Sequence, residues 1–187
     1  MRLVWLVLLT ILRCGSALAG EFSGPVVSVL DGDTIDVLHN GQSERIRLNG
    51  IDAPEKGQPY GKRAKRFLAD LVAGRMVTIQ SHKFDRHKRT VGDVLLADGT
   101  DASQELVRAG LAWWYKQYSK DESLGVLEAE AREAKRGLRA EPDPIPPWVY
   151  RHPERTTEEG LSASTAKGLF ALPQPTPQAG VAKPRTP

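Results

Sequence analysis

The chain lacks most of the residues from which common catalytic sites are built. Its 187 residues include a single cysteine, Cys14, in the N-terminal segment. Without that segment the chain has no thiol, which excludes disulfides, thiolate zinc sites and cysteine nucleophiles. The histidines lack metal-pair spacing, and there is no Gly-x-Ser-x-Gly motif or glycine-rich phosphate loop. Any metal ion must therefore be held by oxygen or imidazole.

The N-terminal segment, residues 1–19, has the pattern of a secretory signal peptide. Arg2 precedes an apolar run, and Ala17-Leu18-Ala19 is a small-x-small cleavage sequence. The run is about 10 residues long, whereas a membrane-spanning helix needs about 20. We expect a secreted or periplasmic protein without stable membrane association after cleavage; an uncleaved membrane anchor is the alternative.

Neither sign of charge is in large excess. The formal net charge is +3, and Arg2 and Arg13 lie in the predicted signal peptide. Basic residues gather instead at 83–89, Lys-Phe-Asp-Arg-His-Lys-Arg. Such a run is commonly a solvated surface, but the position of Arg89 favours a functional role.

Hydrophobic patterning predicts an α+β protein. Strands are expected at 26–30, 34–38, 43–48, 76–81 and 90–96, with a hairpin turn at Asn40-Gly41. Helices are expected at 61–73, 103–109 and 123–135, with Ser103 capping the second. Five short strands and about three helices fit a Greek-key β-barrel of the OB-fold type. The domain is expected over 20–152, followed by a Pro/Ser/Thr-rich tail at 153–187 that we predict to be disordered.

Carboxylates and arginines gather between positions 31 and 55. Asp33 and Asp52 offer oxygens that suit a hard cation, although an aspartate beside glycine or before proline is commonly a turn former. Glu55 follows Asp52 by three residues and can orient or deprotonate a water molecule. Arg47 projects from its strand opposite Ile46 and Leu48, and its planar fork suits phosphate. With the later Arg89, this set indicates a metal-dependent enzyme acting on phosphodiesters.

An aromatic cluster follows the second predicted helix. It comprises Trp113, Trp114, Tyr115 and Tyr118. Core packing and stacking on nucleic-acid bases are both open from the sequence.

Four strings in this order give the chain a close resemblance to the thermonuclease family, the staphylococcal-nuclease-like domains. They are residues 29–34 (VLDGDT), 47–55 (RLNGIDAPE), 85–92 (DRHKRTVG) and 105–112 (ELVRAGLA), and the resemblance covers roughly 24–150. It implies an OB-type barrel and endonucleolytic cleavage of single-stranded or frayed DNA and of RNA, leaving 3′-phosphate ends. Two departures stand out: His87-Lys88 replaces a common aromatic and glycine, and Ala53 replaces a threonine found in some members.

The resemblance also implies roles for individual residues. Asp33, Asp52 and the Ala53 carbonyl correspond to Ca²⁺ ligands, and Arg47, Glu55 and Arg89 to catalytic residues. Expected substrate-binding residues are Asp85, Arg86, His87, Tyr115 and Tyr118. We therefore predict a monomeric, calcium-dependent endonuclease with little sugar specificity. The alternatives are a non-catalytic nucleic-acid-binding OB-fold module and, more remotely, a carbohydrate-binding barrel.

Overall fold

The computed structural model describes residues 20–152. The predicted signal peptide and the predicted C-terminal tail lie outside the described residues. Among the described residues, 20–148 belong to one compact unit and 149–152 to a second. The barrel and the three longer helices belong to the first unit.

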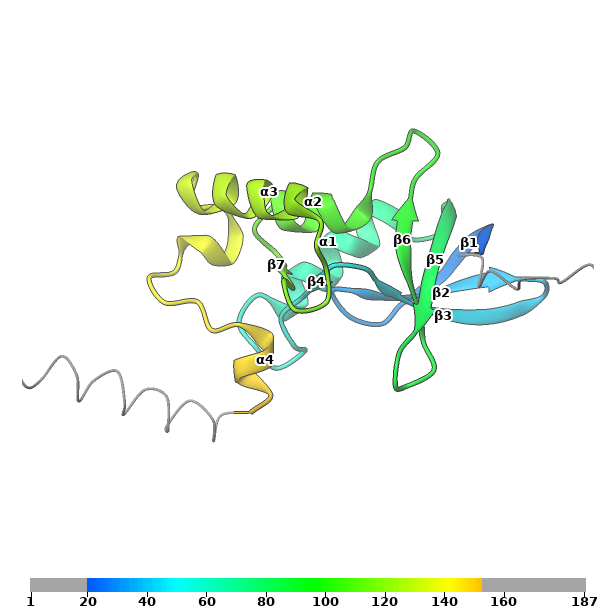
Figure 1. Cartoon of the computed structure of the whole chain (residues 1–187), viewed down its shortest axis with the longest axis horizontal. Coiled ribbons are helices and arrows are strands. Elements are labelled where there is room, and N and C mark those ends of the chain that lie inside the picture. The colour runs from blue at the N-terminus through cyan, green and yellow to red at the C-terminus, as the bar shows by residue number, and fades with distance from the viewer. Residues whose placement is uncertain (1–19, 153–187) are drawn as a thin grey trace, which may run out of the picture. The chain divides into compact units, whose positions relative to one another are not determined.

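Five strands close into a barrel in the order β1-β2-β3-β6-β5 (Figure 1). The strands are β1 (Glu21–Val29), β2 (Thr34–His39), β3 (Gln42–Leu48), β5 (Met76–Phe84) and β6 (Thr90–Leu95). All neighbouring pairs are antiparallel except β3 and β6, which run parallel. Alternate residues such as Ile35, Ile46 and Ile79 fill the interior and are fully buried. The predicted five-stranded barrel is confirmed.

The hairpin between β2 and β3 turns at Asn40-Gly41. Both residues have positive φ, 50° and 76°, as a type I′ turn requires. The register that follows pairs Thr34 with Arg47 and Asp36 with Arg45. The turn predicted from the sequence is confirmed, and it decides which side chains share the outer face of β3.

The first strand begins earlier than the sequence predicts. The prediction began at residue 26, yet Gly24 and Pro25, two residue types that disfavour strands, both pair with β5. A Cβ on Gly24 would lie 2.1 Å from the Leu38 carbonyl oxygen. Glycine stands here because β2 leaves no room for a side chain, and not because the strand ends.

The longer helices lie together beside the barrel, away from the β2–β3 hairpin (Figure 1). They are α1 (Gly61–Val72), α2 (Ala102–Arg108) and α3 (Glu122–Glu133), followed by the 3-10 helix η1 (Gly137–Ala140) and the single-turn α4 (Pro147–Tyr150). The prediction of Ser103 as a cap is wrong. The Asp101 side chain caps α2, because it accepts hydrogen bonds from the backbone N–H groups of Ser103 and Gln104.

A two-stranded sheet of β4 (Ile51–Asp52) and β7 (Trp113–Trp114) was not predicted. Two residues are too few to show a period in the sequence. Asp52 pairs with Trp113 in this sheet, so the small sheet fixes a carboxylate of interest.

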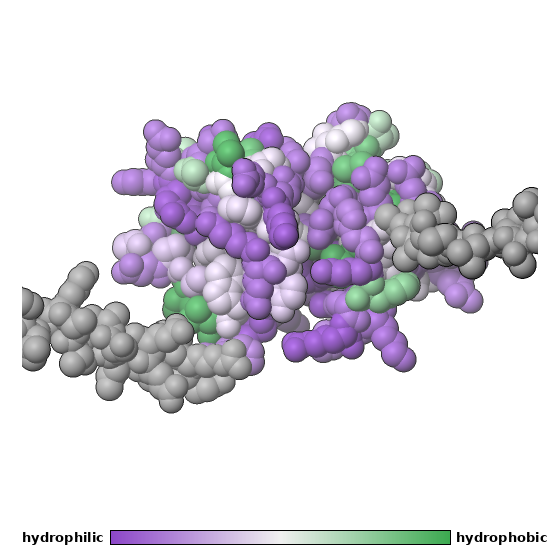
Figure 2. Space-filling view, in the orientation of Figure 1, coloured by the Kyte–Doolittle hydropathy of each residue, from purple (hydrophilic) through white to green (hydrophobic). Residues whose placement is uncertain are grey.

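Polar residues dominate the face drawn in Figure 2, where hydrophobic residues form separate small patches. Among the described residues, none of the helices has the length and apolar character needed to cross a membrane.

Candidate active site

The first carboxylate, Asp33, lies in the tight turn between β1 and β2. The Asp33 N–H donates to Asp31 Oδ1 (3.1 Å), and the Asp33 carbonyl accepts from the Leu48 N–H (2.9 Å). A Cβ on Gly32 would lie 2.7 Å from the Ala53 Cβ and 2.8 Å from the Ala64 Cβ. Glycine at position 32 therefore lets the turn pack directly against β4 and α1.

The second carboxylate, Asp52, is only 1% exposed and comes from β4. The next residue joins the two carboxylates, because the Ala53 N–H donates to Asp33 Oδ2 at 2.7 Å. The pairing of β4 with Trp113 holds this segment from its other side. Two aspartates that are nineteen positions apart in the sequence thus share one buried cluster.

Arg47 lies between the two carboxylates. Its Nη1 is 2.9 Å from Asp33 Oδ2, and its Nη2 donates to Asp52 Oδ1 at 2.9 Å. Nη1 is buried, and its angle to Asp33 makes an ion pair without an aligned hydrogen bond. The guanidinium therefore has donor capacity left for an anion. We call Asp33, Arg47 and Asp52 the buried cluster.

Burial raises the pKa of Asp33 to about 7, although Arg47 lowers it. Asp31 adds a further negative charge that also raises the pKa. The attraction of Arg47 thus does not offset the loss of hydration at this carboxylate. A second positive charge at the buried cluster would stabilise the ionised form.

The donor atoms of the buried cluster fit a hard cation. Asp33 and Asp52 each have a second carboxylate oxygen besides the one facing Arg47, and Asp33 Oδ1 accepts from the Thr34 hydroxyl at 3.1 Å. Calcium accepts carboxylate and backbone carbonyl oxygens in irregular arrangements. Among residues 20–152, however, three or more His, Cys, Asp or Glu side chains never gather as a metal-binding group. The fit therefore depends on two carboxylates and backbone oxygens such as that of Ala53.

Arg89 comes from the turn between β5 and β6, in which one carboxylate organises the backbone. Asp85 Oδ1 accepts from the N–H groups of His87 (2.8 Å) and Arg89 (3.0 Å). Asp85 Oδ2 is 2.7 Å from Arg89 Nε. Burial alone would raise the pKa of Asp85, but these hydrogen bonds outweigh it, and the pKa is lowered. We call residues 85–89 the basic turn.

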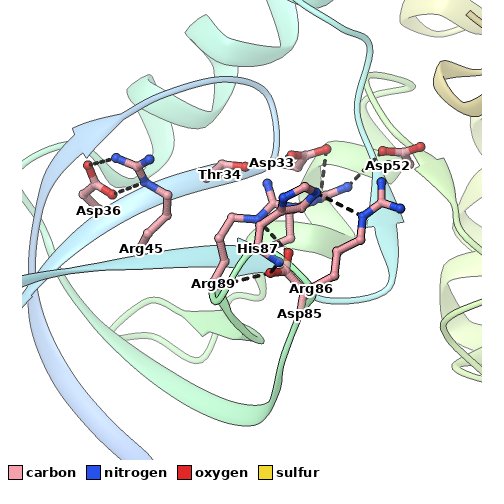
Figure 3. Close-up of polar contacts among 10 residues, drawn as sticks. Asp33, Thr34, Asp36, Arg45, Asp52, Asp85, Arg86, His87 and Arg89 are labelled. Atoms are coloured by element: carbon pink, nitrogen blue, oxygen red, sulfur yellow. Dashed lines mark hydrogen bonds and ion pairs between the residues drawn. The ribbon is translucent and has the colours of Figure 1, made fainter. Parts of the chain in front are cut away.

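The parallel pairing of β3 with β6 brings the basic turn to the buried cluster. Ile46 pairs with Thr90 and Arg47 with Val91, so Arg89 lies beside the segment that carries Arg47. Figure 3 draws Asp33 and Asp52 together with the labelled residues of the basic turn. Of the two arginines singled out in the sequence, Arg47 thus lies on β3 and Arg89 immediately precedes the adjacent strand β6.

Glu55 follows β4 in a short loop that leads to α1. Its N–H donates to Gln58 Oε1 (3.1 Å) and its carbonyl accepts from the Gln58 N–H (2.9 Å). A Cβ on Gly61 would lie 2.0 Å from the Glu55 carbonyl oxygen, so α1 packs closely against this loop. The backbone of Glu55 is thereby fixed, and its side chain is half-buried.

The aromatic cluster divides into core and surface members. Trp113 is buried, and Tyr115 stacks on Trp148 with ring centroids 5.2 Å apart and an angle of 6°. Tyr118 is 58% exposed, and Lys83 Nζ lies 5.8 Å from its ring centroid. Of the two tyrosines expected to bind substrate, Tyr118 presents the more open surface, whereas one face of Tyr115 is covered.

Of the remaining members of the predicted substrate-binding set, Arg86 and His87 are exposed and Asp85 is half-buried. Arg86 Nε donates to His87 Nε2 at 3.0 Å, and both side chains face solvent. Sequence reasoning missed Arg45, which Asp36 holds by two hydrogen bonds (2.9 and 3.4 Å). Strand alternation places Arg45 on the same face as Arg47, and this pattern could have indicated that Arg45 lies near the site.

Comparison with known proteins agrees with this architecture. Residues 45–141 match the family described as staphylococcal nuclease homologue. An uncharacterized endonuclease of Escherichia coli O157:H7 is 49% identical over 135 residues, which cover 72% of this chain and 88% of that protein. A micrococcal nuclease of Shigella flexneri is 43% identical over 141 residues, or 70% of this chain and 81% of that protein.

The barrel, the buried cluster and these matches define a nuclease-type OB-fold domain. The chain belongs to the staphylococcal nuclease homologue family. The resemblance inferred from the four sequence strings is thus confirmed. The family and its named relatives support a hydrolase that cleaves phosphodiesters, as an endonuclease does.

Proposed function

We propose that the protein is a calcium-dependent endonuclease that hydrolyses DNA and RNA with little sugar specificity. The observation that carries the proposal is Arg47 held between two buried carboxylates, with Arg89 in the turn that leads into the neighbouring strand β6. Phosphodiester cleavage is chiefly a problem of positioning and charge stabilisation. Two guanidinium groups beside carboxylates supply both.

Each side chain has a defined task in this proposal. Arg47 and Arg89 bind the non-bridging oxygens of the scissile phosphate and neutralise the charge that develops on them. Glu55 orients the attacking water and accepts its proton. A bond forms between the water oxygen and phosphorus, and the bond to the 5′ oxygen breaks. The 5′ oxygen takes up a proton, and a 3′-phosphate and a 5′-hydroxyl result.

The proposed metal ligands are Asp33, Asp52 and the backbone carbonyl of Ala53. Their support comes from the oxygen-only donor set and from the burial of both carboxylates in one cluster. When bound, Ca²⁺ supplies positive charge that helps neutralise the phosphate. The chain's own contribution is to hold both carboxylates in place through the Ala53 N–H and Arg47.

Digestion of plasmid DNA, single-stranded DNA and RNA, with calcium and with a chelator, tests the proposal. We expect cleavage only with calcium and 3′-phosphate ends on the products. Glu55→Gln should lower kcat by about 10²-fold or more while keeping affinity for single-stranded DNA. Full activity in chelator, or an unchanged rate in Glu55→Gln, would contradict the mechanism. Tight binding without products would instead indicate a nucleic-acid-binding module.

We further propose that the protein is exported, acts as a monomer and prefers single-stranded or frayed nucleic acid. The support for export is the signal-peptide pattern at residues 1–19. Cell fractionation with an antibody against the C-terminal segment and light scattering of the purified protein test localisation and oligomeric state. A cytoplasmic full-length product, or a stable dimer, would overturn these points.

A further inference from the structure

The surface beside Arg89 contains an open hollow, half of whose lining lies outside the sequence motifs. It is lined by Asp36, Ser43, Arg45, His87, Lys88 and Arg89. These residues come from the β2–β3 hairpin and from the basic turn, and only Arg89 and His87 were expected to contact substrate. The hollow thus adjoins the proposed active site and adds side chains of its own.

The charges around the hollow favour an anion. Arg45, Lys88 and Arg89 contribute three positive charges, and Asp36 is the carboxylate among the lining residues. Asp85, the first residue of the basic turn, is outside the lining and pairs with Arg89. Asp36 engages Nε and Nη2 of Arg45, which leaves N–H groups of that guanidinium directed to other acceptors. Two carboxylates therefore oppose three cations, and Asp36 also fixes the orientation of one of them.

The backbone at Lys88 adds an independent observation. Lys88 has φ of +60°, a conformation that glycine adopts at lower free-energy cost. A strained residue persists where the surrounding structure holds it, and such residues cluster at ligand sites. Lysine at this position keeps a positive charge at the rim of the hollow despite the strain.

The position of Arg45 relative to Arg47 identifies the ligand. Both lie on the outer face of β3, two residues apart, which corresponds to about 7 Å along a strand. An extended nucleic-acid strand spans a comparable distance between one phosphate and the next. A strand whose scissile phosphate lies at Arg47 and Arg89 can therefore place its neighbouring phosphate in the hollow.

We propose that the hollow is a second phosphate subsite, in which Arg45 and Lys88 bind the phosphodiester adjacent to the scissile one. The inference rests on the proposed function only in taking nucleic acid as the ligand. The subsite makes the enzyme favour oligonucleotides with several phosphates over a dinucleotide, which has a single phosphodiester.

The primary test is binding without cleavage. A fluorescein-labelled oligothymidylate dodecamer is titrated with full-length protein in chelator over a series of salt concentrations. Each phosphate neutralised in a single strand contributes about 0.7 to the slope of log K against log salt. We expect Arg45→Ala and Lys88→Gly each to reduce the slope by about that amount, and Arg45→Lys to keep it.

The matched control is Arg108→Ala. Arg108 on α2 is also an exposed arginine in a surface ion pair, with Glu105 at 3.2 Å, and lies outside the hollow. It should leave the slope unchanged. Lys88→Gly relieves a strained backbone position, so its effect cannot come from loss of folding. An unchanged slope in both Arg45→Ala and Lys88→Gly, or an equal loss in Arg108→Ala, would overturn the subsite.

A second readout uses the ratio of kcat/KM for the dodecamer to kcat/KM for a thymidine dinucleotide. Arg45→Ala should lower this ratio by about fivefold to tenfold, because only the longer substrate reaches the hollow. A protein that binds but does not cleave refutes the proposed endonuclease while the slope still tests the subsite. A protein that cleaves with an unchanged slope and ratio refutes the subsite alone.

Discussion

The two arginines of the site are held in contrasting ways. Arg47 belongs to the buried cluster, where its partners come from β4 and from the turn before β2. Arg89 belongs to the basic turn, where its partner Asp85 is four residues away. The barrel and β4 therefore position Arg47, whereas local hydrogen bonds position Arg89. Different substitutions should consequently disrupt the buried cluster and the basic turn.

The largest difference should follow removal of each arginine's positive charge. Arg47→Ala removes the positive charge that pairs with two buried carboxylates, and breaking a buried ion pair costs about 3–5 kcal/mol. We expect activity to fall by about 10²-fold or more and urea unfolding to shift to lower concentration. Arg89→Ala should lower activity similarly with little change in stability, because its pair is partly exposed. Equal destabilisation by the two variants would contradict the conclusion that the two arginines are held in different ways.

Arg47→Lys serves as the control for folding. It retains the positive charge between Asp33 and Asp52 but loses the bidentate fork. Stability should recover toward the wild-type value while activity stays low. Recovery of activity as well would show that charge alone suffices at this position.

Gly32→Ala tests the support of the buried cluster without touching its charges. The added Cβ would overlap the side chains of Ala53 and Ala64. We expect a loss of about 1–3 kcal/mol in the free energy of unfolding, as for other overpacked sites, together with lower activity. Gly20→Ala is the matched control, because a Cβ there meets nothing within 4 Å. Wild-type stability in Gly32→Ala would show that the turn can move away without consequence.

Asp85→Ala tests the basic turn. It removes the acceptor for the N–H groups of His87 and Arg89 and for the Arg89 side chain. Activity should fall by about tenfold through loss of positioning, and stability by less than about 1 kcal/mol. Adding Arg47→Lys to Asp85→Ala in a double-mutant cycle measures whether the two halves act independently on stability. A large coupling energy would contradict their separate support.

The smallest expected effect is a pH dependence at Asp85. Its pKa in the folded protein lies below the ordinary value of 3.8, so its stabilising contribution is present above that value. The contribution is lost as pH falls through the lowered folded-state pKa. The stability difference between the wild type and Asp85→Asn should therefore shrink between about pH 5 and about pH 2. A stability difference that stays constant over this range would contradict a stabilising role for the ionised Asp85 carboxylate.

The elements with clear periodicity could be predicted from the sequence. The five barrel strands, the Asn40-Gly41 turn and the helix at 61–73 depend on local patterns, and the structure contains all of them. The pairing of β4 with β7 could not be predicted, because it depends on contacts between residues about sixty positions apart. The first half of β1 could not be predicted from local pattern, because glycine and proline at positions 24 and 25 disfavour strands.

The candidate site was predictable as a set of residues but not as a set of contacts. The sequence pointed to Asp33, Arg47 and Asp52 individually, and the structure joins them through ion pairs and the Ala53 N–H. Periodicity does not reveal such contacts, since they arise only when the barrel closes. Arg45 was passed over because its partner Asp36 becomes a neighbour only in the hairpin register.

The parallel pairing of β3 with β6 has a consequence for refolding experiments. It joins Arg47 to Val91 across a long stretch of chain, whereas the β2–β3 and β5–β6 pairings join neighbouring segments. Contacts that close long loops form slowly compared with local hairpins. This pairing brings the turn that carries Arg89 beside the strand that carries Arg47. The rate at which enzymatic activity returns during refolding should therefore report the rate of barrel closure. Circular dichroism, in contrast, also reports the hairpins and helices that form earlier.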